Sequence, residues 1–240
     1  MRKVLTLITA RSGSKGLKDK NIKKIDKKTL VEFKNVCAVK ANIKNNDIYL
    51  STNSIKYISY FRKKKIDCIK RPSKLAQDNT ESKPVLIHAI NHLKKKSFYY
   101  DDIILLEPAT PFTSYKDLRK AYNIFKKKKL DVIASVEKLE FNSIFASEMR
   151  NKSLKLMFTR LKKIKKLRRQ NFSNEFKMDG GFYIFKISSL LKFANLFDFR
   201  KKAQGFQVDK ISALNIETIF DFKIGQYYYK NFPSLKKNFK

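Results

Sequence analysis

A run of glycine, serine and basic residues follows the first apolar segment of the chain. The apolar segment covers residues 4–9, and residues 10–21 then read Ala-Arg-Ser-Gly-Ser-Lys-Gly-Leu-Lys-Asp-Lys-Asn. Glycines let the backbone approach a ligand closely, and successive N–H groups can form a nest that binds an anion. The side chains of Arg11, Lys15 and Lys20 can neutralise a triphosphate. The run matches neither the P-loop nor the dinucleotide-binding fingerprint. It predicts a phosphate site after the first strand, with a plain basic turn as the alternative.

Other residues whose side chains could bind a ligand or take part in a reaction form weaker patterns. His88 and His92 are four residues apart on a predicted helix, which is zinc-ligand spacing, but no adjoining glutamate or third ligand accompanies them, so helix packing is favoured. Cys37 and Cys68 lack metal-ligand spacing and fit inert core thiols of a reducing compartment. The tyrosines at 227–229 could stack on bases, although a C-terminal docking helix is favoured.

The elements that would position these residues alternate through the first half of the chain. Strands are predicted over residues 4–9, 48–50, 66–69, 103–106 and 132–136, and helices over residues 30–43, 55–64, 85–93 and 118–125. This order predicts an α/β fold, a three-layer Rossmann-like sandwich around a mostly parallel central sheet. In such sheets ligands bind beyond the carboxyl ends of the strands, so the polar stretches that follow strands are expected to carry the chemistry.

The core face of the first helix and the second half of the chain complete this prediction. The apolar positions expected to face the core are Val31, Phe33, Val36, Val39 and Ile43. After residue 138 the alternation breaks, and residues 140–177 are irregular and very basic. Within them, residues 160–169 place apolar residues every third position, which fits an amphipathic surface helix or part of a dimer arm. A further strand is predicted over 182–185 and a final helix over 217–229.

Lysine and arginine dominate the composition. The formal net charge is +34 in 240 residues, and the lysines are spread over nearly every predicted helix. A solvated cationic surface is therefore favoured over dedicated nucleic-acid binding, although anionic substrates should be attracted. The apolar stretch near the N-terminus is too short for a signal peptide, and no run approaches the roughly 18–20 residues that span a bilayer. We expect a cytoplasmic protein without a membrane segment.

The first loop resembles the N-terminal signature of the acylneuraminate cytidylyltransferases, the CMP-sialic acid synthetase family. In that family an Ala-Arg-x-x-Ser-Lys-Gly-(hydrophobic)-x-x-Lys-Asn loop wraps CTP. The matching residues here are Ala10, Arg11, Ser14, Lys15, Gly16, Leu17, Lys20 and Asn21.

Further blocks resemble this family in the same order along the chain. They are Ser51-Thr52-Asn53, the Arg-Pro-x-x-Leu-Ala-x-Asp block at 71–78, Ser82, the Leu-Leu-Glu-Pro-Ala-Thr-Pro-Phe block at 105–112, Arg169-Gln170, the Asp-Gly-Gly-Phe-Tyr-Ile block at 179–184 and the Asn-Ile-Glu segment at 215–217. The resemblance covers nearly the whole chain. It implies one nucleotidyltransferase domain over 1–240, with residues 140–177 a dimerisation and sugar-site insertion.

The resemblance also implies a role for each matching position. The reaction would join CMP from CTP to a sialic-acid-like nine-carbon keto-sugar with release of pyrophosphate, and it would use Mg²⁺ and a homodimer. Catalysis is assigned to Arg11, Lys15 and Lys20. Nucleotide binding is assigned to Ala10, Arg11, Ser14, Lys15, Lys20, Asn21, Asn53, Arg71 and Ser82. Sugar binding is assigned to Glu107, Thr110, Arg169, Gln170, Lys177 and Tyr183, and metal binding to Asn215 and Glu217.

Several positions depart from the family pattern. Asn215 and Glu217 replace two metal-binding aspartates, so one negative charge is lost. Glu107 replaces a glutamine near an anionic sugar, which is unfavourable unless its carboxylate accepts hydrogen bonds from hydroxyls or amides. Lys177 replaces an arginine and loses the bidentate fork. These changes suggest a relative of sialic acid, such as a legionaminic- or pseudaminic-type sugar. Two alternatives stay open: another nucleotide or sugar, for example GTP, and an inactive paralogue that binds polyanions.

Overall fold

A seven-stranded sheet forms the centre of the computed structural model, which describes residues 2–14, 16–148, 153, 155–162, 172–196, 198 and 202–239. The strand order is β5-β4-β1-β6-β8-β7-β9. The strands are β1 (Val4–Thr9), β4 (Asn46–Thr52), β5 (Asp67–Lys70), β6 (Asp102–Leu106), β7 (Val132–Lys138), β8 (Phe176–Lys186) and β9 (Ala203–Gln207). Of these strands only β8 runs antiparallel to its neighbours. The carboxyl ends of the other six therefore share one edge, where β8 begins.

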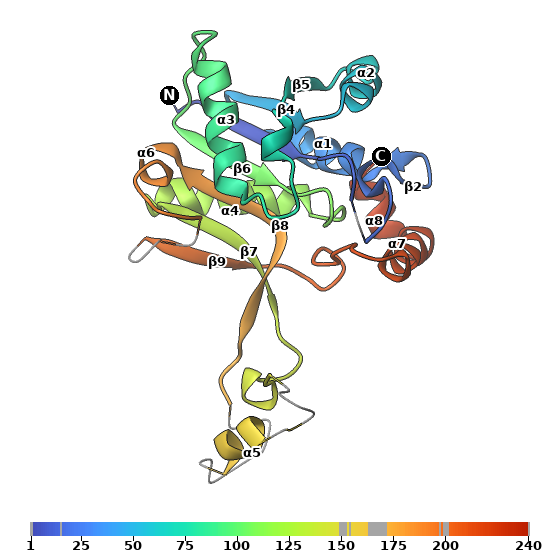
Figure 1. Cartoon of the computed structure of the whole chain (residues 1–240), viewed down its shortest axis with the longest axis vertical. Coiled ribbons are helices and arrows are strands. Elements are labelled where there is room, and N and C mark those ends of the chain that lie inside the picture. The colour runs from blue at the N-terminus through green and yellow to red at the C-terminus, as the bar shows by residue number, and fades with distance from the viewer. Residues whose placement is uncertain are drawn as a thin grey trace.

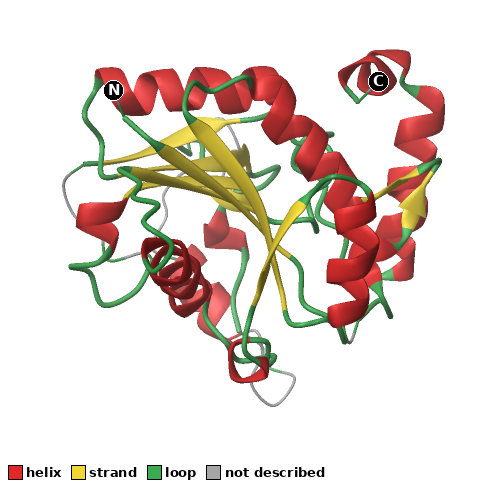
Figure 2. Cartoon of the chain, turned by 90° about the horizontal axis from the view of Figure 1, so that it is seen from above, coloured by secondary structure: helices red, strands yellow, loops and turns green. Residues whose placement is uncertain are grey.

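Helices cover both faces of the sheet, as Figure 2 shows from above. One core contains α1 (Leu30–Ala41), α2 (Ile55–Lys63), α4 (Tyr115–Lys127), α7 (Ile219–Asn231) and α8 (Pro233–Asn238). The other contains α3 (Ser82–Lys94) and α6 (Ile187–Leu190). Short elements are η1 (Lys20–Ile22), η2 (Ser73–Leu75), η3 (Ser143–Phe145), α5 (Lys155–Leu161) and the hairpin of β2 (Lys24–Ile25) and β3 (Lys28–Thr29). In the part of the chain that is described, no helix is long and apolar enough to span a bilayer.

The alternating residues of β1 explain why both faces need helices. Val4 and Ile8 pack into the core that holds α1, while Leu5 and Leu7 pack into the core that holds α3, and all four side chains are fully buried. A central parallel strand is apolar on both faces because each face must be covered. This confirms the predicted mostly parallel α/β sandwich.

Helix α1 confirms the apolar pattern at Val31 and Phe33, which are buried, and contradicts it at Val39. Phe33 is fully buried and contacts Phe112, Tyr229 and Phe239 edge to face, with ring centroids 4.9–5.6 Å apart. Val39, by contrast, is 58% exposed. The buried stripe runs through Leu30, Lys34, Cys37 and Ala41. The sequence pattern did not reveal this buried stripe because it contains Lys34, and a lysine in a helical pattern is normally assigned to the solvent-facing side.

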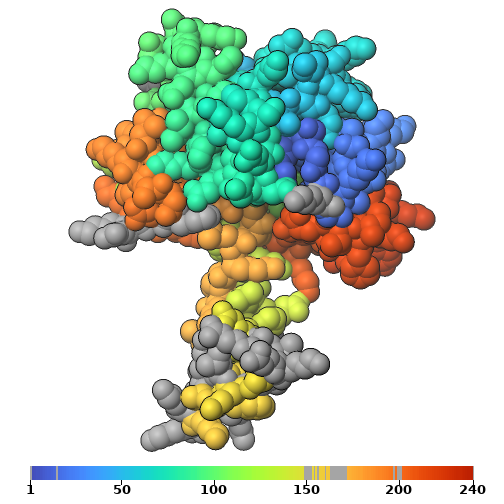
Figure 3. Space-filling view, viewed as in Figure 1, coloured from blue at the N-terminus to red at the C-terminus, as the bar shows by residue number. Residues whose placement is uncertain are grey.

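The segment between β7 and β8 leaves the sheet as an arm. Ala134 pairs with Tyr183 but Val136 pairs with Met178, so β8 carries extra residues within this register shift. Beyond the shift the two strands continue as a ribbon that crosses itself and carries η3 and α5 at its far end, well clear of the sheet (Figures 1 and 3). Helix α5 ends at Leu161, and most of the predicted 160–169 helix lies outside the described residues.

We predict that Phe33→Ala destabilises the protein by about 3–5 kcal/mol, because it removes a fully buried ring and leaves a cavity among three aromatic neighbours. Val39→Ala on the same helix is the matched control and should change stability by no more than about 0.5 kcal/mol, since its side chain is 58% exposed. Urea unfolding followed by circular dichroism measures both. Equal losses in the two variants would contradict this assignment of the core.

Candidate active site

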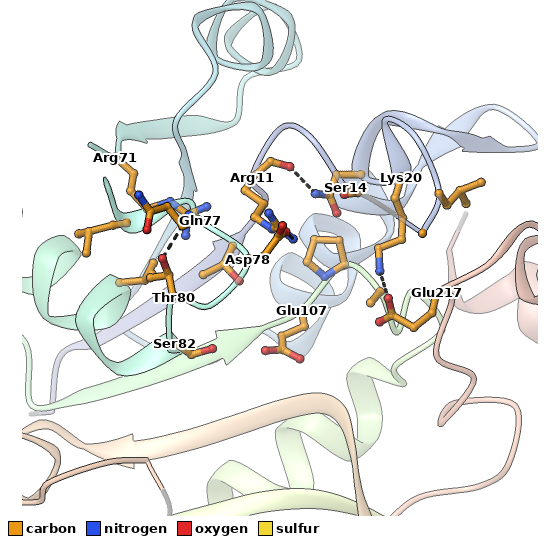
Figure 4. A pocket seen from close by; sticks show the side chains of 18 residues that line it. Arg11, Ser14, Lys20, Arg71, Gln77, Asp78, Thr80, Ser82, Glu107 and Glu217 are labelled. Carbon is orange, nitrogen blue, oxygen red and sulfur yellow. Dashed lines mark hydrogen bonds and ion pairs between the residues drawn. The ribbon is translucent and has the colours of Figure 1, made fainter. Parts of the chain in front are cut away.

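Loops that follow the strands enclose a cavity of ≈ 450 Å³ at the carboxyl edge of the sheet. Figure 4 shows its basic and acidic side chains converging from four parts of the chain. The lining residues are Thr9, Arg11, Ser14, Gly16, Leu17, Lys20, Asn21, Arg71, Leu75, Gln77, Asp78, Thr80, Ser82, Val85, Glu107, Pro108, Ala109 and Glu217. The cavity therefore combines most of the predicted phosphate loop with the segments after β5 and β6.

Asparagine side chains hold the first loop in shape. The Ser12 N–H donates to Asn53 Oδ1 at 3.0 Å, and Asn53 Nδ2 donates to Ser12 Oγ at 3.0 Å. Asn21 Nδ2 donates to the Arg11 carbonyl oxygen at 2.9 Å. Of the two predicted nucleotide-binding asparagines, Asn21 lines the cavity and Asn53 does not. In this structure Asn53 serves the loop rather than the cavity.

The loop also lies tightly against the segment that precedes α7. A Cβ atom added to Gly16 would be 2.7 Å from the carbonyl oxygen of Glu217. The Ile216 N–H donates to the Ala109 carbonyl oxygen at 2.7 Å, which ties the same segment to the turn after β6. Three separate parts of the chain are thus held together around the cavity, and a glycine at position 16 makes the close approach sterically possible.

Two cations of the loop are already paired with carboxylates. Arg11 Nη2 lies 2.5 Å from Asp78 Oδ1, and Lys20 Nζ lies 2.8 Å from Glu217 Oε2. All four residues line the cavity. A polyanionic ligand would compete with both carboxylates for these cations, so the site can exchange internal ion pairs for ligand contacts.

Arg71 is a third cation in the cavity lining, and it is buried. Its residue is 6% exposed, and its buried Nε has no hydrogen-bond partner among the described residues. Burial, together with the nearby positive charge of Arg11, lowers the pKa of Arg71 to about 10. A buried guanidinium N–H without an acceptor costs free energy, which a ligand that supplies an acceptor recovers.

The floor of the cavity is acidic. Glu107 follows β6, is half-buried and lines the cavity. Burial raises the pKa of Glu107, Glu217 and Asp179 add to this, and the charges of Lys34 and Lys20 oppose it. The fully buried Lys34 donates to Thr113 Oγ1 and, at 2.8 Å, to the Gly181 carbonyl oxygen. Sequence reasoning missed Lys34, although its place in the stripe of α1 was a usable signal.

The structure places the predicted sugar-site residues in several different locations. Glu107 lines the cavity. Thr110 is buried and donates to the Asp179 carbonyl oxygen at 3.1 Å, so it holds the start of β8. Lys177 lies on the arm and pairs with Glu137 at 3.1 Å. Tyr183 lines a second, apolar cavity on the α3 face of β7 and β9. Burial raises the pKa of Tyr183, and the charges of Glu107 and Asp179 add to this.

Three predicted residues fall outside the described residues, namely Lys15, Arg169 and Gln170. Ala10 is buried at the end of β1, where its N–H donates to the Ser51 carbonyl oxygen at 3.0 Å. Ser14 and Ser82 both line the cavity, and their role in nucleotide binding stays a prediction.

The two predicted metal ligands, Asn215 and Glu217, flank the buried Ile216 and differ in their position relative to the cavity. Glu217 lines the cavity, whereas Asn215 is exposed and is not part of its lining. No group of three or more His, Cys, Asp or Glu side chains that could hold a metal occurs in the described ranges. Mg²⁺ is commonly held by one or two carboxylates together with substrate phosphates. Glu217 therefore fits a Mg²⁺ ion that arrives with a nucleotide.

The remaining candidate groups take structural positions. The rings of His88 and His92 stack at 6.2 Å between centroids. Cys37 is buried, and burial raises the pKa of its thiol to about 12. Cys68 is half-buried, and burial raises the pKa of its thiol to about 11. Tyr229 packs on Phe33, as a docking helix requires.

Comparison with known proteins identifies relatives of this chain. The model of a family described as cytidylyltransferase matches residues 5–237. The post-translational flagellin modification protein B of Campylobacter coli is 26% identical over the full length of both chains, 100% of each. The CMP-N,N'-diacetyllegionaminic acid synthase of Campylobacter jejuni is 30% identical over 95% of each chain. The N-acylneuraminate cytidylyltransferase of Escherichia coli is 26% identical over 92% of this chain but only 51% of that protein.

Solved structures share the fold at low sequence identity. A CMP:2-keto-3-deoxy-manno-octonic acid synthetase complexed with CTP has a TM-score of 0.67 at 13% identity, over 95% of this chain and 98% of that one. A cytidylyltransferase from Leptospira borgpetersenii has a TM-score of 0.59 at 16% identity, over 97% of this chain and 88% of that one. These neighbours support the Rossmann-like α/β architecture.

We predict that Gly16→Ala weakens CTP binding by roughly tenfold or more, because its Cβ would contact the Glu217 carbonyl oxygen at 2.7 Å and displace the loop that carries Arg11 and Lys20. Calorimetric titration with CTP and Mg²⁺ measures the affinity. Gly205→Ala on β9 is the control, because Gly205 does not line this cavity. Its added Cβ would lie 3.1 Å from the side chain of Val136 on β7. Unchanged CTP affinity in Gly16→Ala would refute the importance of this contact.

Proposed function

We propose that this chain, which belongs to the cytidylyltransferase family, transfers CMP from CTP to a sialic-acid-type nine-carbon keto-sugar and releases pyrophosphate. The observation that carries the proposal is the cavity at the carboxyl edge of the sheet, where Arg11, Lys20 and Arg71 converge and the buried Nε of Arg71 has no hydrogen-bond partner among the described residues. A triphosphate would give Arg71 an acceptor and would replace the carboxylates that pair with Arg11 and Lys20. The family membership makes the transferred group a cytidylyl group.

The reaction forms one bond to phosphorus and breaks another. The anomeric hydroxyl oxygen of the sugar attacks the α-phosphorus of CTP, its proton is released, and the bond from the α-phosphorus to the bridging oxygen breaks with departure of pyrophosphate. No covalent enzyme intermediate is needed, so catalysis consists of positioning and charge neutralisation. Arg11 and Lys20 would neutralise the phosphates, and Lys15 is assigned to the same task from its place in the loop sequence.

Nucleotide binding would rearrange the ion pairs of the free site. Arg11 would exchange Asp78 for a phosphate, and Lys20 would exchange Glu217 for another. The freed Glu217 carboxylate would then hold Mg²⁺ together with the triphosphate. When bound, Mg²⁺ supplies additional neutralisation of the phosphate charge. Asn21, Arg71 and Ser82 would hold the rest of the nucleotide, since all three line the cavity.

The acceptor is proposed to be a neuraminate-, legionaminate- or pseudaminate-type sugar. The name of the legionaminic acid synthase of C. jejuni and that of the E. coli N-acylneuraminate cytidylyltransferase support this class. The departure at Glu107 from the family glutamine favours a sugar other than sialic acid itself. Lys177 on the arm and Tyr183 near the acidic floor would contact parts of the sugar more distant from the phosphate.

A homodimer would complete the sugar site. The arm between β7 and β8 exposes large apolar side chains that a partner subunit would cover: Phe141 (57% exposed), Phe158 (56%), Phe176 (45%) and Met178 (49%). Several exposed large apolar side chains on one segment are typical of an interaction surface. Arg169 and Gln170, which belong to this arm in sequence, would reach the partner's sugar carboxylate.

We expect pyrophosphate release with CTP and a nine-carbon keto-sugar acid, and little with ATP, GTP or UTP. A coupled pyrophosphate assay with each nucleotide against a panel of such acids measures this directly. Omission of the sugar controls for hydrolysis of CTP. Turnover with GTP alone would support the alternative nucleotide, whereas no release with any pair, together with strongly salt-dependent DNA binding, would support a polyanion-binding paralogue.

A further inference from the structure

Glu107 differs from the other two carboxylates in the described lining of the cavity, because it has no partner. Asp78 pairs with Arg11, and Glu217 pairs with Lys20. The Glu107 side chain makes no hydrogen bond or ion pair with any residue that the structure describes, and no dashed line reaches it in Figure 4. It is half-buried and lines the cavity, so it is available to a hydroxyl group that enters.

The backbone holds Glu107 beside the cations of the cavity. Glu107 directly follows β6, and Ala109, two residues further, accepts a hydrogen bond from the Ile216 N–H at 2.7 Å. This bond keeps the turn after β6 next to the segment before α7, whose Glu217 pairs with Lys20. A phosphate that replaces Glu217 at Lys20 would therefore lie close to the turn that carries Glu107.

The start of β8 fixes the other side of the Glu107 side chain. A Cβ atom added to Gly180 would be 3.0 Å from Glu107 Oε2 and 3.4 Å from Thr110 Oγ1. Gly180 also has a φ of +79°, which favours glycine. The carboxylate thus lies between the β8 backbone and the cavity. A carboxylate held in this way can act repeatedly on one atom of a bound substrate.

The surroundings of Glu107 favour its use as a proton acceptor. Burial raises its pKa, Lys34 and Lys20 oppose this, and Glu217 and Asp179 add to it. The ionisable groups that face Glu107 are Lys34 on α1, Lys20 on η1, Asp179 and Tyr183 on β8, and Glu217 before α7. A base is most effective when its pKa lies near the working pH, so a raised pKa suits a carboxylate to this task.

We propose that Glu107 is the general base of the transfer, an inference that rests on the proposed function. The anomeric hydroxyl of the acceptor gives its proton to a carboxylate oxygen of Glu107, and the hydroxyl oxygen forms the bond to the α-phosphorus of CTP. The bond from the α-phosphorus to the bridging oxygen breaks, and its electron pair leaves with pyrophosphate. Glu107 then releases the proton to water, which restores the carboxylate for the next turnover.

The other two carboxylates of the described lining fit this task less well. Glu217 fits Mg²⁺, and a nearby metal cation favours the ionised form of a carboxylate, which weakens it as a proton acceptor. The Asp78 side chain is 40% exposed and lies in the loop between η2 and α3. Glu107, by contrast, is held against β8 and faces the cavity.

Glu107→Gln removes the proton acceptor with almost no change of shape. We expect the single-turnover rate of CMP transfer to a nine-carbon keto-sugar acid to fall by roughly a hundredfold or more. The affinity for CTP, measured by calorimetric titration, should stay unchanged, because the cations that face the phosphates are intact. Glu81→Gln, at an exposed position outside the cavity lining, is the matched control and should keep both values.

Chemical rescue and pH dependence distinguish a base from a group that only shapes the site. Glu107→Ala leaves space for a small carboxylate, so added formate should restore part of its transfer rate. Formate should not rescue Glu107→Gln, whose side chain fills the same space. As the pH rises, the wild-type rate should level off once Glu107 is ionised. The rate of Glu107→Gln should continue to rise, because solvent hydroxide then takes the proton.

Three results would overturn the inference. The first is an unchanged transfer rate in Glu107→Gln. The second is a lower rate with weaker CTP binding or a raised Mg²⁺ requirement, and without formate rescue of Glu107→Ala, which would assign Glu107 to binding. The third is loss of the alkaline plateau in Asp78→Asn instead of Glu107→Gln, which would assign the proton to Asp78. Each can occur while the wild type transfers CMP. Absence of transfer by the wild type contradicts the proposed function itself.

Discussion

Positive charge from Arg11, Lys20 and Arg71 gathers at the carboxyl edge of a parallel sheet, and one buried N–H of this cluster has no acceptor in the described part of the chain. Arg11 pairs with Asp78, and Lys20 pairs with Glu217. The buried Nε of Arg71 has no acceptor within the described chain. Burial of a guanidinium N–H without an acceptor is costly. This arrangement is the basis for the proposal that the site binds an anion, and the family that matches the chain is described as cytidylyltransferase.

The architecture explains why these charges meet. Strands β4, β1 and β6 are parallel neighbours, so their following loops open at one edge. Backbone hydrogen bonds then fix the loops to one another, from the Ala10 N–H to Ser51 and from the Arg71 N–H to Thr52. The register shift in β8 brings Asp179 to the same edge. The cluster of cations and the acidic side chains beside it are both positioned by the same sheet, a few strands apart.

Much of this could be predicted from the sequence, because strongly periodic segments report burial. Residues 4–9 and 132–136 were predicted as strands and lie within β1 and β7. Strand β9 was missed, since Ala203–Gln207 has no β-branched residue, and the strand forms because it can pair with β7. The ion pair between Arg11 and Asp78 joins residues far apart in sequence, so only the fold reveals it. Lys34 was overlooked among many solvated lysines, although its spacing from Leu30 and Cys37 placed it on the buried face of α1.

A crystal structure of the chain with CTP and Mg²⁺ tests the central claim most directly. We predict the triphosphate against Arg11 and Lys20, with the Arg11–Asp78 and Lys20–Glu217 pairs broken. An acceptor atom of the nucleotide should lie within hydrogen-bond distance of Arg71. A nucleotide bound elsewhere, or bound with both ion pairs intact and the Nε of Arg71 still without a partner, would contradict it.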